Sequence, residues 1–135
     1  MKSDTRIWLK YAEENYSSAI ILMDQGLLNN SIQNFQQAIE KYLKAYLIFQ
    51  STTFKFSHDL IYLLDLITQK DSDFESYYDT VSELQGYAVE IRYPNETIFI
   101  SNEKVEKAMM VAKEIREFVT GKMKITVDYN DIIDT

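Results

Sequence analysis

The chain has 135 residues, 46% of them hydrophobic, and a formal net charge of -7 at pH 7. This length fits one domain with a core large enough to be stable without disulfides, and no cysteine is present to require an oxidising compartment. The acidic balance argues against broad electrostatic attraction to nucleic acids or anionic membranes, but it is compatible with a local basic pocket.

The N-terminal residues lack the apolar segment of a signal peptide. The longest apolar runs, residues 19–23 and 45–49, are too short to span a bilayer. We therefore expect a soluble cytoplasmic protein with no membrane partner. Three glycines and one proline are few turn-forming residues for this length, which favours few, long helices.

The first predicted helix covers residues 4–25 and ends at Gly26, because glycine takes a left-handed conformation without strain. Its inward stripe has the spacing of three and four residues that is typical of a helix face. The stripe consists of Trp8, Ala12, Asn15, Ala19 and Leu22, widened by Ile7, Tyr11 and Met23. The connection that follows, residues 27–29, is short enough to make the next helix an antiparallel neighbour.

The second predicted helix, residues 32–49, is the one around which we expect the core to form. Residues three and four apart place one apolar face inward: Ile32, Phe35, Ile39, Tyr42, Tyr46 and Phe49. Glu40 and Lys44 belong to the polar side of its first part, whereas residues 45–49 are all apolar. We therefore expect Asn30 to cap the helix, Lys44 to be exposed, and the end with Phe49 to be buried on all sides.

Three more helices follow. One begins near Ser57 and buries Leu60, Leu63, Leu64 and Ile67. The next begins with a capping box at residues 72–75, buries Tyr77, Val81, Leu84, Ala88 and Ile91, and ends before Pro94. The last is capped by Ser101, buries Val105, Ala108, Met109, Ala112, Ile115 and Val119, and ends at Gly121. Gly86 is either tolerated in its helix, at a cost of about 1 kcal/mol, or marks a close helix crossing.

These elements predict an all-α protein, an antiparallel (up-and-down) four-helix bundle with an additional short helix. The bundle occupies residues 1–121. The tail, residues 122–135, alternates polar and apolar residues, so we expect it to be extended and weakly ordered.

Few residues are suited to chemistry. No glycine-rich phosphate loop and no group of metal ligands at usable spacing is present, so no cofactor or metal is expected. His58 is the sole histidine, and the triad reading of Ser57, His58 and Asp59 fails because consecutive side chains at a helix start point apart. These three residues are explained as a capped helix start.

Arg92 and Tyr93 form the second candidate site. A guanidinium at a helix end, before a proline, can hold a phosphate, and the adjacent ring can stack on a base. The alternative is that Arg92 braces its own loop. Lys41 and Lys44, one turn apart, would add positive charge if their face meets Arg92.

The order and spacing of several short segments resemble the HEPN (higher eukaryote and prokaryote nucleotide-binding) domain over residues 4–120. The likeness depends on Trp8 and Ala12, on residues 38–49 (AIEKYLKAYLIF), on His58-Asp59-Leu60, and on Arg92-Tyr93-Pro94. The resemblance implies an all-α bundle that is commonly dimeric and often encoded beside a small nucleotidyltransferase. Many members of this family are ribonuclease toxins whose motif is an arginine, four to six residues, and a histidine.

This sequence departs from that motif, because the positions where the histidine would stand are Thr97, Ile98 and Phe99. The resemblance therefore implies a binding module for a nucleotide or RNA that acts with a nucleotidyltransferase partner in a toxin–antitoxin-like or defence setting. One alternative is a metal-independent ribonuclease with a non-standard site that uses Arg92, Tyr93 and His58. The other is a structural dimerisation domain. We also expect a homodimer, because aromatic residues such as Tyr16, Tyr78 and Tyr87 fall beside the inward stripes.

Overall fold

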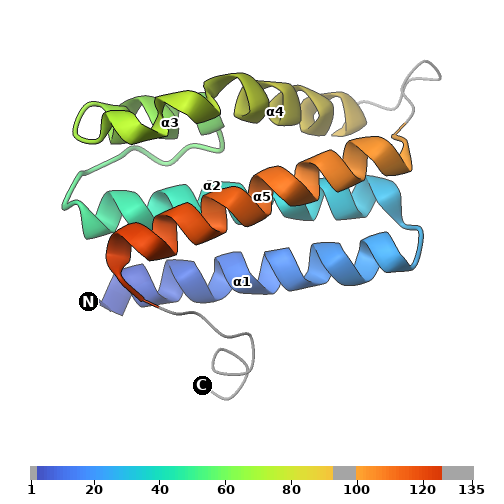
Figure 1. Ribbon diagram of the computed structural model, residues 1–135, viewed down its shortest axis with the longest axis horizontal. Coiled ribbons are helices and arrows are strands. Elements are labelled where there is room, and N and C mark those ends of the chain that lie inside the picture. The colour runs from blue at the N-terminus through green and yellow to red at the C-terminus, as the bar shows by residue number, and fades with distance from the viewer. Residues whose placement is uncertain (1–2, 93–99, 126–135) are drawn as a thin grey trace.

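The computed structural model describes residues 3–92 and 100–125, with side chains for residues 4–87 and 100–125. The helices in these ranges are α1 (Ser3–Asp24), α2 (Leu28–Phe49), α3 (Leu60–Thr68), the 3-10 helix η1 (Ser72–Tyr77), α4 (Tyr78–Arg92) and α5 (Asn102–Met123). No strand occurs within them, so the predicted all-α class is confirmed. The long helices α1, α2 and α5 lie alongside one another, and α3 and α4 form a further layer (Figure 1).

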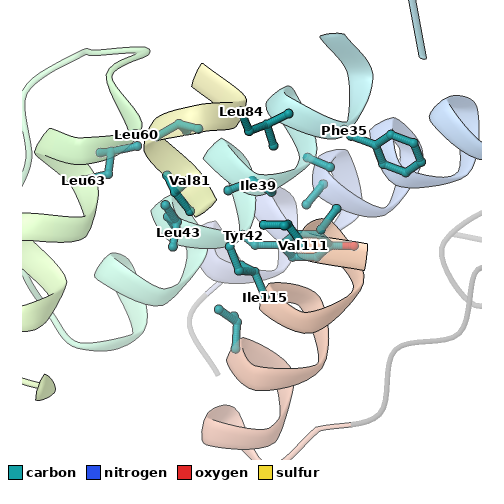
Figure 2. Close-up of a cluster of buried hydrophobic side chains, with 14 of the residues drawn as sticks. Phe35, Ile39, Tyr42, Leu43, Leu60, Leu63, Val81, Leu84, Val111 and Ile115 are labelled. Atoms are coloured by element: carbon teal, nitrogen blue, oxygen red, sulfur yellow. The ribbon is translucent and has the colours of Figure 1, made fainter. Parts of the chain in front are cut away.

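Helix α2 is the centre of the bundle, as its apolar pattern predicts. It packs against α1, α3, α4 and α5. Figure 2 shows Ile39, Tyr42 and Leu43 of α2 beside core side chains from α3, α4 and α5. All three are fully buried.

The end of α2 differs from the prediction in two respects. Phe49 is 42% exposed, and Lys44 is only 2% exposed. The reason is that the start of α1 and the segment before α3 cover the side of α2 that carries Lys44, bringing the rings of Trp8 and Phe56 onto it. Phe49 is the last residue of α2, and its ring stacks on Tyr46 of the same helix, with centroids 6.0 Å apart.

Two helix boundaries were predicted from their capping residues. Gly26 has φ +76°, the left-handed conformation expected after α1. Ser101 caps α5, because its hydroxyl accepts a hydrogen bond from the backbone N–H of Lys104.

Four other boundaries were predicted wrongly. Helix α2 begins at Leu28 without a side-chain cap, so Asn30 lies in its first turn. Asp59, not Ser57, caps α3 by accepting from the backbone N–H groups of residues 61 and 62. Asp71 caps η1, the short helix in which the expected capping box falls. Helix α5 passes Gly121 and ends at Met123, followed by the left-handed Lys124.

Gly86 lies in α4 with no atom within 4 Å of the Cβ position that an alanine would add. A close helix crossing therefore does not explain this glycine. The alternative prediction applies, in which the helix simply tolerates a glycine at this position. The tail beyond Ile125 lies outside the described residues, so the division of the chain at residue 121 stays a prediction.

An ionic contact joins the end of α5 to the start of η1. Lys122 Nζ lies 3.2 Å from a carboxylate oxygen of Asp71 and 2.6 Å from one of Asp73. The hydroxyl of Tyr46 donates to Asp71 over 2.8 Å, which connects α2 to the same contact. Burial and this hydrogen bond raise the pKa of Tyr46 to about 12.

Within the part of the chain that the structure describes, no helix is both long enough and apolar enough to cross a membrane.

Candidate functional site

Helix α2 presents two charged residues, one turn apart, to a histidine from the segment before α3. Lys44 Nζ lies 3.1 Å from one carboxylate oxygen of Glu40, and His58 Nδ1 lies 3.0 Å from the other. The side chains of Lys44 and Glu40 are 3% and 6% exposed, whereas that of His58 is 57% exposed. Both contacts offset the hydration that the Glu40 carboxylate loses on burial.

Two aromatic rings complete this cluster. Lys44 Nζ lies 5.1 Å from the ring centroid of Trp8 and 5.5 Å from that of Phe56, within the range of cation–π contacts. The ring of Phe56 meets that of His58 edge to face, with centroids 5.1 Å apart. Phe56 is nonetheless 86% exposed, an unusual position for a phenylalanine. We call Glu40, Lys44, His58, Trp8 and Phe56 the Glu40 cluster.

Backbone hydrogen bonds fix the segment that carries the exposed ring and the imidazole. The N–H of Lys55 donates to the Tyr62 hydroxyl, and the N–H of Asp59 donates to Ser57 Oγ. The amide nitrogen of Gln85 donates to Asp59 Oδ1, which attaches the segment to α4. The residues on either side of His58 in the chain are therefore fixed by hydrogen bonds, while the outer edge of its imidazole faces solvent.

The imidazole can act as a directed hydrogen-bonding group. A carboxylate only accepts hydrogen bonds, so the Nδ1 that faces Glu40 carries a hydrogen. Nε2 is then the outer nitrogen, and among the described residues no hydrogen bond to it occurs. A carboxylate behind an imidazole is also the arrangement that orients a general base.

Lys41 lies apart from the Glu40 cluster. Its ammonium donates to Asn15 Oδ1 on α1, and the Asn15 amide donates to the side chains of Asn34 and Gln37. Burial lowers the pKa of Lys41 below its ordinary value of 10.5. This network ties α1 to α2, so the structure brings Lys44 and His58 together but does not bring Lys41 to them.

Arg92 is the last residue of α4, and its side chain, like all of Tyr93, lies outside the described residues. Gln85, which contacts the residue after His58, is seven positions earlier in α4. At the rise of a helix this places the Arg92 backbone about 10 Å farther along the axis.

The face between α4 and α5 also carries charged residues. Glu83 accepts from Lys107 at 2.8 Å and from the Tyr87 hydroxyl at 2.6 Å, and these two hydrogen bonds hold its pKa below the ordinary value. Lys104 lies over the Tyr87 ring, 5.0 Å from its centroid. This face leads toward the end of α4 where Arg92 stands.

A second buried network was not anticipated from the sequence. Glu13 is 2% exposed and accepts from Arg116 on α5 at 2.6 and 2.7 Å, with the Tyr42 hydroxyl donating to the same carboxylate. The hydrogen bond to Glu13 raises the pKa of Arg116, and burial beside Glu13 raises that of Tyr42. This network joins α1, α2 and α5 through the side chains of Glu13, Tyr42 and Arg116, and we assign it to the fold.

Glu40, Trp8 and Phe56 were likewise not predicted as site residues. The spacing of Glu40 and Lys44 is that of a helical ion pair, a signal present in the sequence, but both were read as surface residues. Among the described residues no group of three metal-ligating side chains occurs.

A model of the HEPN domain matches residues 5–124. The chain belongs to the HEPN domain family. The crystal structure of ST0689, an archaeal HEPN homologue, is similar to this chain with a TM-score of 0.71 and 22% identity, over 91% of this chain and 99% of that one. No curated protein matches the sequence. Family membership confirms the resemblance seen in the sequence, and the structural likeness supports the HEPN fold.

Proposed function

We propose that this HEPN domain is a binding module for a nucleotide or a short single-stranded RNA, acting with a small nucleotidyltransferase in a toxin–antitoxin-like or defence setting. The observation that carries the ligand class is the Phe56 ring, 86% exposed and beside the oriented imidazole of His58. Every base has a π-face, so an exposed ring offers a stacking surface worth about 1–3 kcal/mol per base.

The groups around this ring fit a nucleotide. The outer nitrogen of His58 can bond the edge of a stacked base, and Lys55, next to Phe56 in the chain and exposed, supplies a positive charge for a phosphate. The net charge of -7 disfavours a long polyanion more than a mononucleotide or short strand, because each added phosphate is repelled by the whole protein.

Isothermal titration with AMP and a six-residue oligoadenylate tests this function. Phe56→Ala should weaken binding about tenfold or more, because it removes the stacking surface. Phe49→Ala removes another exposed phenylalanine, from the end of α2, and is the matched control that should bind like the unmodified protein. Equal affinities for both variants would locate binding elsewhere, and no binding by the unmodified protein would exclude this function.

We place the contact with the nucleotidyltransferase, or with a ligand phosphate, at Arg92. Its position at the end of α4, beyond the face with Lys104 and Lys107, supports this assignment. Arg92→Lys should keep the melting temperature and weaken binding about ten- to a hundredfold, because lysine lacks the planar donor fork. If Arg92 instead braces its loop, the melting temperature should fall and binding per folded molecule should not change.

A ribonuclease with a non-standard site is the second candidate, and the Glu40–His58 pair favours it, because a carboxylate orients the imidazole as in a general base. Cleavage of a fluorescent RNA with EDTA present, lost in His58→Gln, would establish this activity. If the unmodified protein does not cleave the RNA, the binding function stands. The family's motif lacks its histidine here, which favours binding over catalysis.

A further inference from the structure

The Glu40 cluster makes His58 a hydrogen-bond acceptor toward a bound base, and we propose that this site selects bases with an exocyclic amine, adenine and cytosine, over their oxo counterparts. The inference rests on the proposed nucleotide binding beside Phe56 and names the class of base that this site takes. It is carried by contacts among four residues: Glu40, Lys44, His58 and Phe56.

The first step is the position of the imidazole hydrogen. His58 Nδ1 lies 3.0 Å from Glu40 Oε1, and Glu40, ionised beside Lys44, can only accept. The hydrogen of a neutral imidazole must then be on Nδ1, and Nε2 presents a lone pair. The tautomer is therefore set by a side chain that is 6% exposed and held in place by the Lys44 ammonium.

The second step is the position of the carboxylate behind the imidazole. The carboxylate of Glu40 and the ammonium of Lys44 lie 3.1 Å apart, and both side chains are buried. Lys44 acts here as a positioning residue, because it holds Glu40 against Nδ1 of His58 without contacting the ligand.

The third step is the geometry toward the base. The rings of Phe56 and His58 are inclined by 80°, with centroids 5.1 Å apart. We place a base on the exposed face of Phe56 with its edge turned toward the imidazole. Perpendicular planes do not prevent a hydrogen bond, because the Nε2 lone pair and an amine hydrogen can share the line where the two planes meet.

The exocyclic group then decides affinity. Adenine N6 and cytosine N4 each offer an N–H to Nε2, whereas hypoxanthine and uracil carry an oxygen at the same place. An oxygen would face another acceptor, so the complex would lose one hydrogen bond and gain a repulsion. For a partly exposed site we expect about a three- to tenfold preference for the amine.

The test compares AMP, purine riboside 5′-monophosphate and IMP by isothermal titration at pH 8. These three share the ring and the phosphate and differ at position 6 in having an amine, a hydrogen or an oxygen. We expect affinity to fall in that order, and His58→Leu to bind all three alike. Nitrogen-15 NMR of the histidine should show the hydrogen on Nδ1 and a shift of the Nε2 signal when AMP is added, which a merely structural role of Glu40 and Lys44 would not produce.

Lys44→Met gives a further readout. Without the ammonium, Glu40 loses the contact that holds it against Nδ1 of His58, so the preference for AMP over IMP should shrink. His58→Leu still tests the inference if this variant fails to fold. Equal affinities of AMP and IMP for the unmodified protein would overturn the base preference and leave nucleotide binding intact. Failure of all three to bind would overturn both.

Discussion

Lys44 should be among the most costly side chains to remove, although lysines are usually at the surface. Lys44→Ala leaves the buried carboxylate of Glu40 without its ammonium partner, and breaking a buried pair in this way costs about 3–5 kcal/mol. Urea denaturation of the variant should show a loss of this size. The double variant Lys44→Met with Glu40→Met should recover most of the stability, because it also removes the unpaired charge.

Phe49→Ala is the matched comparison on the same helix. Its ring is 42% exposed and contacts Tyr46 in its own helix, so the loss should be below about 1 kcal/mol. A loss for Phe49→Ala that equals or exceeds the loss for Lys44→Ala would contradict the burial of the two residues.

From the sequence we expected Phe49 to be buried and Lys44 to be exposed, the opposite of what the structure shows, and the reason is physical. Periodicity locates one apolar face of α2, but it carries no information about which other faces are covered. Lys44 is covered because Trp8 and Phe56 come to it from distant positions in the chain. Residues 45–48 are indeed buried or partly buried, and the expectation fails only at the helix end.

At the scale of helices, Asp59 should contribute more to α3 than its neighbour Ser57. The Asp59 carboxylate accepts from the backbone N–H groups of Ile61 and Tyr62 and from the Gln85 side chain. Asp59→Ala should therefore cost about 1–2 kcal/mol in urea denaturation, and Ser57→Ala, which loses one exposed hydrogen bond, less than about 0.5 kcal/mol. Equal losses would show that Ser57 shares the capping role.

The existence and order of the helices could be predicted from the sequence, but most of their caps could not. Two residues with side chains suited to capping, Ser57 and Asp59, stand two positions apart, and composition alone does not choose between them. The end of α5 shows the same limit. Gly121 is the expected terminator, yet burial of Met123 continues the helix and leaves the left-handed conformation to Lys124.

At the scale of the whole molecule, the contact between α5 and η1 should make stability depend on pH. Burial raises the pKa of Asp71, but hydrogen bonds from Tyr46, from the Asp73 backbone and from Lys122 outweigh it and hold the pKa below its ordinary 3.8. A carboxylate whose pKa is lower in the folded than in the unfolded protein stabilises the fold at pH values above its unfolded-state pKa. This stabilisation is lost as the pH falls through its folded-state pKa.

Asp71→Asn should accordingly lower the melting temperature at pH 7, by an amount equivalent to about 1–2 kcal/mol for the lost charge-assisted hydrogen bonds. The difference from the unmodified protein should shrink as pH falls from about 4 toward about 2, where both carry a neutral side chain at this position. A difference that is the same at pH 7 and near pH 2 would show that Asp71 acts through packing alone.

The candidate site was predicted only in part, because its members are far apart in the chain. Glu40 and His58 are 18 positions apart, and no local pattern brings a helix residue to a loop imidazole at that separation. His58 and Lys44 were predicted as separate candidates, His58 for catalysis and Lys44 for ligand binding. Glu40, the residue that unites them, lies on the side of α2 read as solvent-facing, so its role depends on the tertiary fold.

Dimerisation is the last property expected of the whole molecule, and its basis changes with the structure. Tyr16, Tyr78 and Tyr87, which suggested an interface, are partly buried against the core. Ile7 and Tyr11, one turn apart on α1, were predicted to widen its inward stripe, but each is 48% exposed. Helical spacing brings Ile21, 58% exposed, to the same side, which makes this face of α1 the apolar surface that we expect a second copy to cover.

Light scattering of the unmodified protein at tens of micromolar, a concentration at which even weak interfaces form, should therefore give the mass of a dimer. The double variant Ile7→Glu with Tyr11→Glu should be monomeric, because four buried carboxylates across a two-fold interface would repel one another and lose hydration. Met110→Glu is the control: this residue is 60% exposed on a different helix, α5, so its replacement should leave the dimer intact. A monomeric unmodified protein would refute dimerisation, and a dimer that survives the double variant but not Met110→Glu would move the interface to α5.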